Sequence, residues 1–317
     1  EKNQGKDREG VTAELVKDVY LPLTEKKLGV ALVGLGKYST EQLAPALQET
    51  RHCSLAGIVT GTESKIQEWK VKYSIADSNI YNYENFDDIC SNKEINILYI
   101  VLPNALHAEY VIRGAKARKH IICEKPMGLS VEECDDMISA CKEAGVMLSI
   151  GYRLHFEPRY KDVMKMGKSK IFGELTNIHA SHGSDDTEGW RQDEKLAGGG
   201  PLMDLGIYCI QAARYTSGME PIAVKATEAE KTNPDLFKNI EESLTWEMEF
   251  PNGHTALCET SYTTDMNSLH ADAAHGWFEL SPAYPYEGIK GKQPLALSIS
   301  LRSINRHYRW TISHMPY

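Results

Sequence analysis

The chain has 317 residues, of which 42% are hydrophobic and 25% are charged. This length and apolar content are enough for a large buried core, and they favour two domains over one. The formal net charge of -9 argues against nucleic acid or an anionic membrane as a partner. No apolar run reaches the roughly 20 residues that a membrane-spanning helix needs.

The seven cysteines include no C-x-x-C pair, and most of them lie within apolar segments. This spacing indicates reduced core residues rather than a disulfide framework or a zinc site, so no metal is expected. The chain begins at Glu1 rather than at a methionine. The lack of an export signal therefore carries no information about where the protein acts.

Residues 1–27 are polar and weakly patterned, and we expect them to form an N-terminal arm. From residue 28 to residue 150, apolar strands alternate with amphipathic helical segments. Such alternation is typical of an α/β fold with a doubly wound parallel sheet, which predicts a dinucleotide-binding (Rossmann) domain over 28–150. Strands are expected at 28–33, 54–59, 96–101, 120–123 and 147–150, with helices near 40–50, 63–73, 107–117 and 130–144.

The pattern changes after Gly151. Longer strand-like runs follow, and residues 250–254 (Phe-Pro-Asn-Gly-His) predict a hairpin turn between two of them. We therefore expect residues 151–292 to form a C-terminal α+β domain with a mixed, largely antiparallel open sheet. Its predicted strands are 173–182, 221–229, 242–250 and 254–262.

A glycine-rich turn joins the first predicted strand to the first helix. In such a turn, bare backbone N–H groups and the helix dipole face a phosphate, although a tight turn without a ligand is the alternative. Ser39 stands where a third glycine is common, and it can cap the helix in a capping box with Gln42. The residues expected to bind the dinucleotide here are Gly34, Gly36, Lys37 and Tyr38.

The tripeptide Glu124-Lys125-Pro126 directly follows the predicted strand 120–123. Parallel sheets bind their ligands at the carboxyl ends of the strands, so Lys125 is expected beside the reactive end of the dinucleotide. A solvated turn is the alternative.

Further motifs accompany this tripeptide, at residues 34–38 (GLGKY), 102–109 (LPNALHAE), 123–127 (CEKPM), 151–153 (GYR), 190–191 (WR) and 198–208. Through these motifs the chain resembles, over roughly residues 28–292, the family of glucose–fructose oxidoreductase, inositol dehydrogenase and the rhizopine-catabolism oxidoreductases. Tyr208 stands where relatives often carry histidine, and it indicates the glucose–fructose oxidoreductase branch.

The resemblance implies that Lys125 lies by the nicotinamide and the substrate hydroxyl. Asp204 and Tyr208 are four residues apart, so on a helix they share one face. A phenol with an ordinary pKa of about 10 needs a nearby cation to act as a base near neutral pH, and Lys125 can supply it. Asp204 can orient both the sugar and the lysine. The alternative for Tyr208 is a ring packed in the core.

Further cofactor contacts are expected on the same grounds. Pro103 and Asn104 are placed at the ribose–nicotinamide part, and His107 either caps the next helix or lines the pocket. Arginine at 153 and 191 can hydrogen-bond cofactor or substrate oxygens, or lie on the surface. The set is Pro103, Asn104, His107, Glu124, Lys125, Arg153, Trp190 and Arg191.

The end of the second strand distinguishes the two nicotinamide cofactors. An NAD site usually carries an Asp or Glu there, for the ribose 2′-hydroxyl. Here the strand ends at Thr60 without a carboxylate, and Lys65 follows. A hydroxyl and a cation suit a 2′-phosphate, so NADP is favoured over NAD. Alternatively, Thr60 is a turn residue and Lys65 is solvated.

Past Lys292 the resemblance stops, and 293–317 form a basic, patternless stretch. Read in a shifted frame, the codons for 303–313 can spell I-N-Q-Q-A-L-Q-M-D-D-F, a helix of the relatives. We therefore expect an aberrant, frame-shifted tail.

Together these features predict an NADP-dependent oxidoreductase that moves a hydride between nicotinamide and a carbinol carbon of a small sugar or polyol. The alternatives are a cofactor-assisted glycosidase of the same superfamily and a non-catalytic, truncated NADP-binding homologue. We expect a homo-oligomer, dimer or tetramer, formed through the C-terminal sheet. Exported members of the branch favour the periplasm, with the cytoplasm as the alternative.

Overall fold

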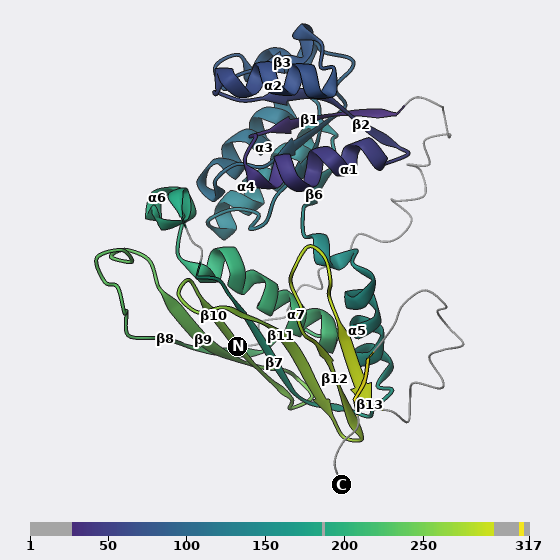
Figure 1. Ribbon diagram of the computed structural model, residues 1–317, viewed down its shortest axis with the longest axis vertical. Coiled ribbons are helices and arrows are strands. Elements are labelled where there is room, and N and C mark those ends of the chain that lie inside the picture. Colours follow the sequence, from purple (N-terminus) through teal and green to yellow (C-terminus); the bar gives the residue numbers. More distant parts are fainter. Residues whose placement is uncertain (1–26, 186–187, 295–310, 314–317) are drawn as a thin grey trace, which may run out of the picture. The chain divides into compact units, whose positions relative to one another are not determined.

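The computed structural model describes residues 27–185, 188–294 and 311–313 (Figure 1). The chain divides into two compact units, Glu1–Ile97 and Leu98–Tyr317. Because the described residues begin at Lys27, the rest of the predicted N-terminal arm, 1–26, lies outside them.

Within the described residues, the first sheet has six strands in the order β3-β2-β1-β4-β5-β6. The pairs β1–β2, β2–β3 and β5–β6 run parallel. This doubly wound order confirms the predicted Rossmann fold. Its strands are β1 (Leu28–Val33), β2 (Cys53–Val59), β3 (Ile80–Tyr81), β4 (Ile97–Ile100), β5 (His120–Cys123) and β6 (Leu148–Ile150).

The helices that alternate with these strands begin close to their predicted positions. Ser130 caps α4, because its hydroxyl accepts the amide of Glu133 at 3.1 Å. The capping box predicted at Ser39 is wrong: Ser39 lies inside the helix and donates its hydroxyl to the Gly34 carbonyl at 2.7 Å. The helices are η2 (Ser39–Leu43), α1 (Ala44–Glu49), α2 (Glu63–Tyr73), α3 (His107–Lys116) and α4 (Val131–Ala144).

Replacing Ser130 with alanine removes the cap of α4, and the amide of Glu133 then loses its partner. We expect the free energy of unfolding to fall by about 1 kcal/mol, measured by urea denaturation. Ser64→Ala, at an exposed position within α2, is the matched control and should not lower stability. Equal stability of the two variants would contradict the cap.

In the part of the chain that the structure describes, the second sheet has eight strands in the order β14-β13-β12-β11-β7-β10-β9-β8. The pairs β7–β10 and β13–β14 are parallel, and the others are antiparallel. The predicted mixed, largely antiparallel sheet is confirmed. Its strands are β7 (Leu175–Gly183), β8 (Ala223–Glu228), β9 (Ser243–Glu249), β10 (Thr255–Ser261), β11 (Met266–Ala273), β12 (Gly276–Leu280), β13 (Gly291–Pro294) and β14 (Thr311–Ser313).

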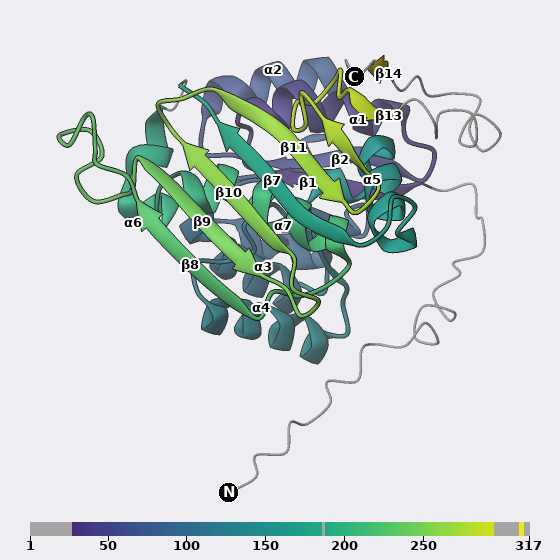
Figure 2. The same cartoon turned by 90° about the horizontal axis from the view of Figure 1, so that it is seen from below.

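Helix α7 (Ile207–Ser217) packs on one face of this sheet, with α5 (Pro158–Ser169) beside it (Figure 1). The burial pattern of the strands explains this packing. On β10, for example, Ala256 and Cys258 are fully buried, while the residues next to them, Thr255, Leu257 and Glu259, are partly exposed. Period-two burial of this kind gives each strand one apolar face. In Figure 2 the strands lie in front and α7 lies behind them, and no helix of the described residues covers the near face. That this face joins copies of the chain stays a prediction.

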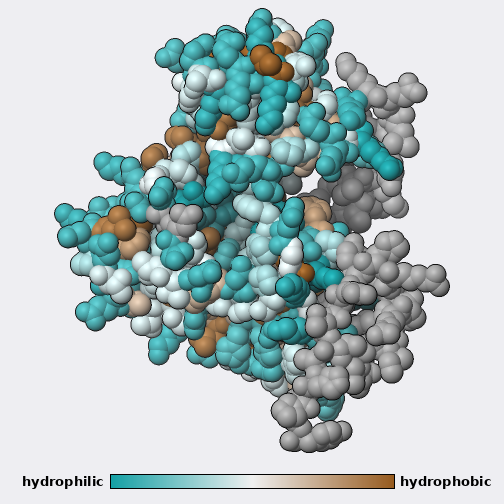
Figure 3. Space-filling model, viewed as in Figure 1, coloured by the Kyte–Doolittle hydropathy of each residue, from teal (hydrophilic) through white to brown (hydrophobic). Residues whose placement is uncertain are grey.

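The surface in Figure 3 is largely hydrophilic, with small, separate apolar areas. Among the described residues, no helix is long and apolar enough to cross a membrane. The exposed large apolar side chains include Val71, Val131, Ile222 and Val224.

The predicted tail, 293–317, lies mostly outside the described residues. Its predicted start falls within β13, where Gln293 is buried. Residues 311–313 form β14, which pairs with β13 through Lys292 and Thr311.

Candidate active site

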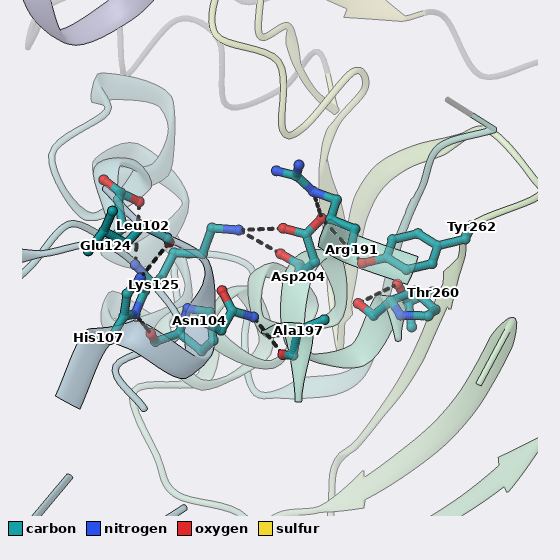
Figure 4. Close-up of polar contacts among 12 residues, drawn as sticks. Leu102, Asn104, His107, Glu124, Lys125, Arg191, Ala197, Asp204, Thr260 and Tyr262 are labelled. Atoms are coloured by element: carbon teal, nitrogen blue, oxygen red, sulfur yellow. Dashed lines mark hydrogen bonds and ion pairs between the residues drawn. The ribbon is translucent and has the colours of Figure 1, made fainter. Parts of the chain in front are cut away.

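The carboxylate of Asp204 holds two cations at the centre of the candidate site. Lys125 Nζ lies 3.1 Å from Asp204 Oδ1 and also donates to the Asp204 backbone carbonyl at 2.7 Å. Arg191 Nε lies 2.7 Å from Asp204 Oδ2. Figure 4 shows the two basic side chains reaching the carboxylate from different sides. All three were predicted as site residues, and the fold brings them together.

Burial and charge act against each other in this cluster. Burial alone raises the pKa of Asp204, but the positive charges of Lys125 and Arg191 lower it well below its usual range. Burial alone lowers the pKa of Lys125, but its interactions with Tyr208 and with the Asp204 carboxylate raise it above its usual range. The aspartate is therefore ionised and the lysine protonated at neutral pH.

Local structure places Asp204 and Tyr208 on the same side of one helix. Asp204 lies in a π-helical segment, η8 (Leu202–Gly206), which continues directly into α7. Tyr208 is buried at the start of α7, and Lys125 Nζ lies 4.8 Å from the centre of its ring. The predicted proximity of Lys125, Asp204 and Tyr208 is thus present.

Aromatic rings surround Tyr208. Tyr152, His182 and Tyr284 have ring centres 5.4, 5.2 and 6.0 Å from it. The alternative interpretation, that the Tyr208 ring packs in the core, therefore also holds for this side chain. Tyr208 combines a packed ring with a position beside a buried ammonium group.

Tyr262 also contacts Asp204 and was not predicted. Its hydroxyl donates to Asp204 Oδ2 at 3.4 Å, and its ring is buried (Figure 4). Tyr262 directly follows β10 and is the last residue of the predicted strand 254–262. Its place at a strand end is the one sequence feature that could have suggested a site residue. Nothing in the local pattern shows which residue a strand end will face.

Asn104 and His107 contact the protein backbone. Asn104 Nδ2 donates to the carbonyl of Ala197 at 2.9 Å. The fully buried ring of His107 places Nδ1 2.8 Å from the Pro126 carbonyl and Nε2 3.0 Å from that of Leu102. His107 thereby ties the residue after Lys125 to the end of β4. The cofactor contacts expected of both residues stay predictions.

Glu124 precedes Lys125 in the chain, and the Arg153 guanidinium lies 5.8 Å from the centre of the Tyr208 ring. The Tyr99 hydroxyl donates to Glu124 at 2.7 Å, and burial raises the pKa of Glu124. The Arg153 guanidinium donates to the carbonyls of Tyr284 and Pro285 and stacks over the Tyr286 ring at 4.6 Å. Arg153 thus fixes a loop of aromatic residues rather than lying free on the surface.

The remaining predicted residues, Pro103 and Trp190, lie at or beside short helices. Pro103 precedes the short helix η5 (Asn104–Leu106). The ring of Trp190, on η7 (Gly189–Gln192), lies 4.7 Å from the Arg191 guanidinium. Among the described residues, no group of three or more His, Cys, Asp and Glu could hold a metal ion.

In the first unit, the glycine turn has the geometry that a phosphate needs. Gly34 has a φ of 94°, which favours glycine. A Cβ atom on Gly36 would have no protein atom within 4 Å, so the space over this backbone is open. Lys37 is exposed and Tyr38 is half-buried at the start of the helix. These residues fit a bound pyrophosphate.

Thr60 and Lys65 also lie near this turn. Thr60 is buried at the end of β2, and its hydroxyl accepts the Thr62 amide at 3.2 Å. Lys65 Nζ donates to the carbonyl of Leu35 at 2.6 Å, which brings a cation to the glycine turn. The alternative, that Lys65 is solvated, does not account for this contact.

His182, which sequence patterns did not single out, stacks on Tyr284 with ring centres 4.5 Å apart. Burial, with Lys125 and Arg153 nearby, lowers the pKa of His182 to about 4, although Asp204 opposes the shift. As the pH falls, the His182 imidazole binds a proton near pH 6.5 in the unfolded chain but only near pH 4 in the folded protein. Stability therefore falls as the pH drops from about 6.5 to 4.

The variant His182→Gln removes this proton uptake. Between pH 7 and pH 4.5, wild type should lose roughly 2 kcal/mol more unfolding free energy than the variant does. Urea denaturation at both pH values measures this difference, with the exposed His52→Gln expected to follow wild type. Parallel pH dependence in wild type and His182→Gln would refute the buried neutral state.

The fold and the site define a dinucleotide-dependent oxidoreductase. Residues 28–152 match the oxidoreductase family with an NAD-binding Rossmann fold, and residues 160–279 match the GFO/IDH/MocA C-terminal domain. The chain therefore belongs to the GFO/IDH/MocA oxidoreductase family.

Similar proteins include sugar dehydrogenases. The chain is 30% identical over 276 residues to D-xylose 1-dehydrogenase (NADP(+)) of Haloarcula marismortui, covering 83% of this chain and 75% of that protein. It is 24% identical over 311 residues to D-glucoside 3-dehydrogenase of Escherichia coli, covering 90% and 86%. The crystal structure of aldose-aldose oxidoreductase from Caulobacter crescentus, complexed with glycerol, superposes with a TM-score of 0.82 at 38% identity, covering 84% and 81%.

Proposed function

We propose that the protein is an NADP-dependent oxidoreductase that transfers a hydride between nicotinamide and a carbinol carbon of a small sugar or polyol. The observation that carries this proposal is the buried ion pair of Lys125 and Asp204 with the Tyr208 ring beside the ammonium. The sugar substrates named for the similar proteins support it. The tyrosine at 208 favours the glucose–fructose oxidoreductase branch, with an aldose as the substrate.

Oxidation of a carbinol removes a hydride from carbon and a proton from oxygen. A dinucleotide held at the glycine turn of Gly34 and Gly36 would supply the acceptor for the hydride. Tyr208 takes the hydroxyl proton in its ionised, phenolate form, and the Lys125 ammonium beside it stabilises that form. Asp204 holds Lys125 in place and leaves the ammonium protonated throughout. Arg191 supplies a second positive charge that keeps Asp204 ionised.

Lys125→Ala and Tyr208→Phe should each lower kcat for sugar oxidation by about 100-fold or more, as loss of an acid–base group does. NADP(H) affinity should stay nearly unchanged, because neither change touches the glycine turn. Steady-state kinetics and nucleotide titration measure both.

The matched controls are Tyr215→Phe, on the same helix α7, and Lys142→Ala, on α4. Both should keep wild-type turnover. Near-normal sugar oxidation by Tyr208→Phe would disprove the assigned proton transfer.

The preference for NADP rests on Thr60 and Lys65, which lie by the turn where the adenosine ribose is proposed to bind. Lys65→Ala should weaken NADP binding by about 1.5–3 kcal/mol, the value of one charge-assisted phosphate contact. NAD binding should change little, since NAD lacks the 2′-phosphate. Titration of both nucleotides, with Lys72→Ala on the same helix α2 as the control, measures the selectivity. Equal affinity of wild type for NAD and NADP would overturn this assignment.

A further inference from the structure

The helix that carries Asp204 is held at its beginning by a residue 37 positions further along the chain. Glu241 accepts the backbone amide of Gly200 at 2.8 Å with one carboxylate oxygen and that of Leu202 at 3.1 Å with the other. Leu202 is the first residue of η8, and no side chain of its own segment caps this helix. The first amides of a helix need acceptors, and an anion there also suits the helix dipole.

Close contact explains why the chain before η8 is glycine. A Cβ atom on Gly200 would lie 2.1 Å from the backbone oxygen of Glu241 and 2.9 Å from its Cδ atom. Only a residue without a side chain allows the two segments to approach so closely. The glycine run and Glu241 therefore form one contact, made by backbone as well as by side chain.

The segment that carries Glu241, residues 229–242 between β8 and β9, has its own anchor. The neighbouring Glu242 is buried and accepts the amides of Thr232 and Asn233 at 2.8 and 3.0 Å and the Thr263 hydroxyl at 2.9 Å. Burial alone raises the pKa of Glu242, but these donors together lower it. Glu242 thus closes its own loop, and Glu241 reaches outward to the helix.

Apolar packing links the same segment to Asp204 by a second route. Phe237 and Ile240 form a small core with Tyr262, against which Leu205 packs. Tyr262 in turn donates its hydroxyl to Asp204. The segment 229–242 therefore contacts both the beginning of the helix and a side-chain partner of Asp204.

We infer that Glu241 is a positioning residue for Asp204: its carboxylate fixes the start of η8 so that the Asp204 carboxylate faces Lys125. No proton or electron passes through Glu241, and its effect reaches the reaction only through Asp204. This inference rests on the oxidoreductase function proposed above. It accounts for an acidic side chain whose two carboxylate oxygens both accept amides at the start of the segment that carries Asp204.

The variant Glu241→Gln keeps the size of the side chain but replaces one acceptor oxygen with an amide donor. Hydrogen exchange of the whole protein, followed by mass spectrometry, should show the amides of Gly200 and Leu202 exchanging at least tenfold faster. Lys125 should also react with acetic anhydride at lower pH, because a displaced Asp204 raises the lysine pKa less. With sugar and NADP, kcat/KM should fall about tenfold, while NADP affinity stays within twofold.

Glu247→Gln, an exposed glutamate on β9, makes the same charge change and should match wild type in every measurement. Gly200→Ala, which separates the two segments sterically, should reproduce the effects of Glu241→Gln. A purely structural role would lower the melting temperature of Glu241→Gln but leave the pH of Lys125 labelling unchanged, and that result would overturn the inference. Wild-type exchange at Gly200 and Leu202 in Glu241→Gln would overturn it as well.

Exchange and lysine labelling need no turnover, so they test Glu241 independently of the reaction. Absence of sugar-dependent turnover in wild type would disprove the proposed function. The labelling result would then still decide whether Glu241 positions Asp204.

Discussion

One buried carboxylate, that of Asp204, determines how the candidate active site is built. An ionised group taken out of water loses several kcal/mol of solvation, which only well-placed partners offset. Lys125, Arg191 and Tyr262 are those partners, and each comes from a different segment of the chain. Removing one partner of such a buried pair typically costs 3–5 kcal/mol. A well-packed apolar cluster would be at least as stable, so the charges point to chemistry rather than to stability.

The backbone around this carboxylate is shaped to present it. The π-helical turn at Leu202–Gly206 is a form that often occurs at functional sites, and here it contains Asp204 itself. His107 contacts the carbonyls of Leu102 and Pro126, so the turn that carries Lys125 is connected to the chain that follows β4. Aromatic rings around Tyr208 exclude water, which strengthens the electrostatic effect of Lys125 on the phenol.

Local patterns predicted those parts of the fold that local physics controls. The apolar patterns predicted the observed bounds of β1, β5 and α2. Strand and helix periodicity depends only on residues that are close together in the chain, so a local pattern can reveal it. The two-residue strand β3 was missed, since two residues carry no period. Strands β11 and β12 were missed as well, although both are regular in the structure. The capping box at Ser39 failed because the Gly34 carbonyl takes the serine hydroxyl.

The sequence by itself determined the two sheet classes and the glycine turn, since periodicity and local motifs encode them, and the spacing of Asp204 and Tyr208 placed them on one helix face. That Lys125 joins them was implied by the resemblance to the family. Only the tertiary structure decided which side chains complete the site. Tyr262, His182 and Glu241 are 58, 22 and 37 positions from Asp204 along the chain, so no local pattern relates them to it. Tyr262 and His182 meet Asp204 or its neighbours because the sheet pairs β7 with β10 beside the helical segment that carries Asp204. Glu241 reaches the start of that segment from the chain between β8 and β9. Contacts of that kind depend on how the segments pack, and packing is a property of the whole fold.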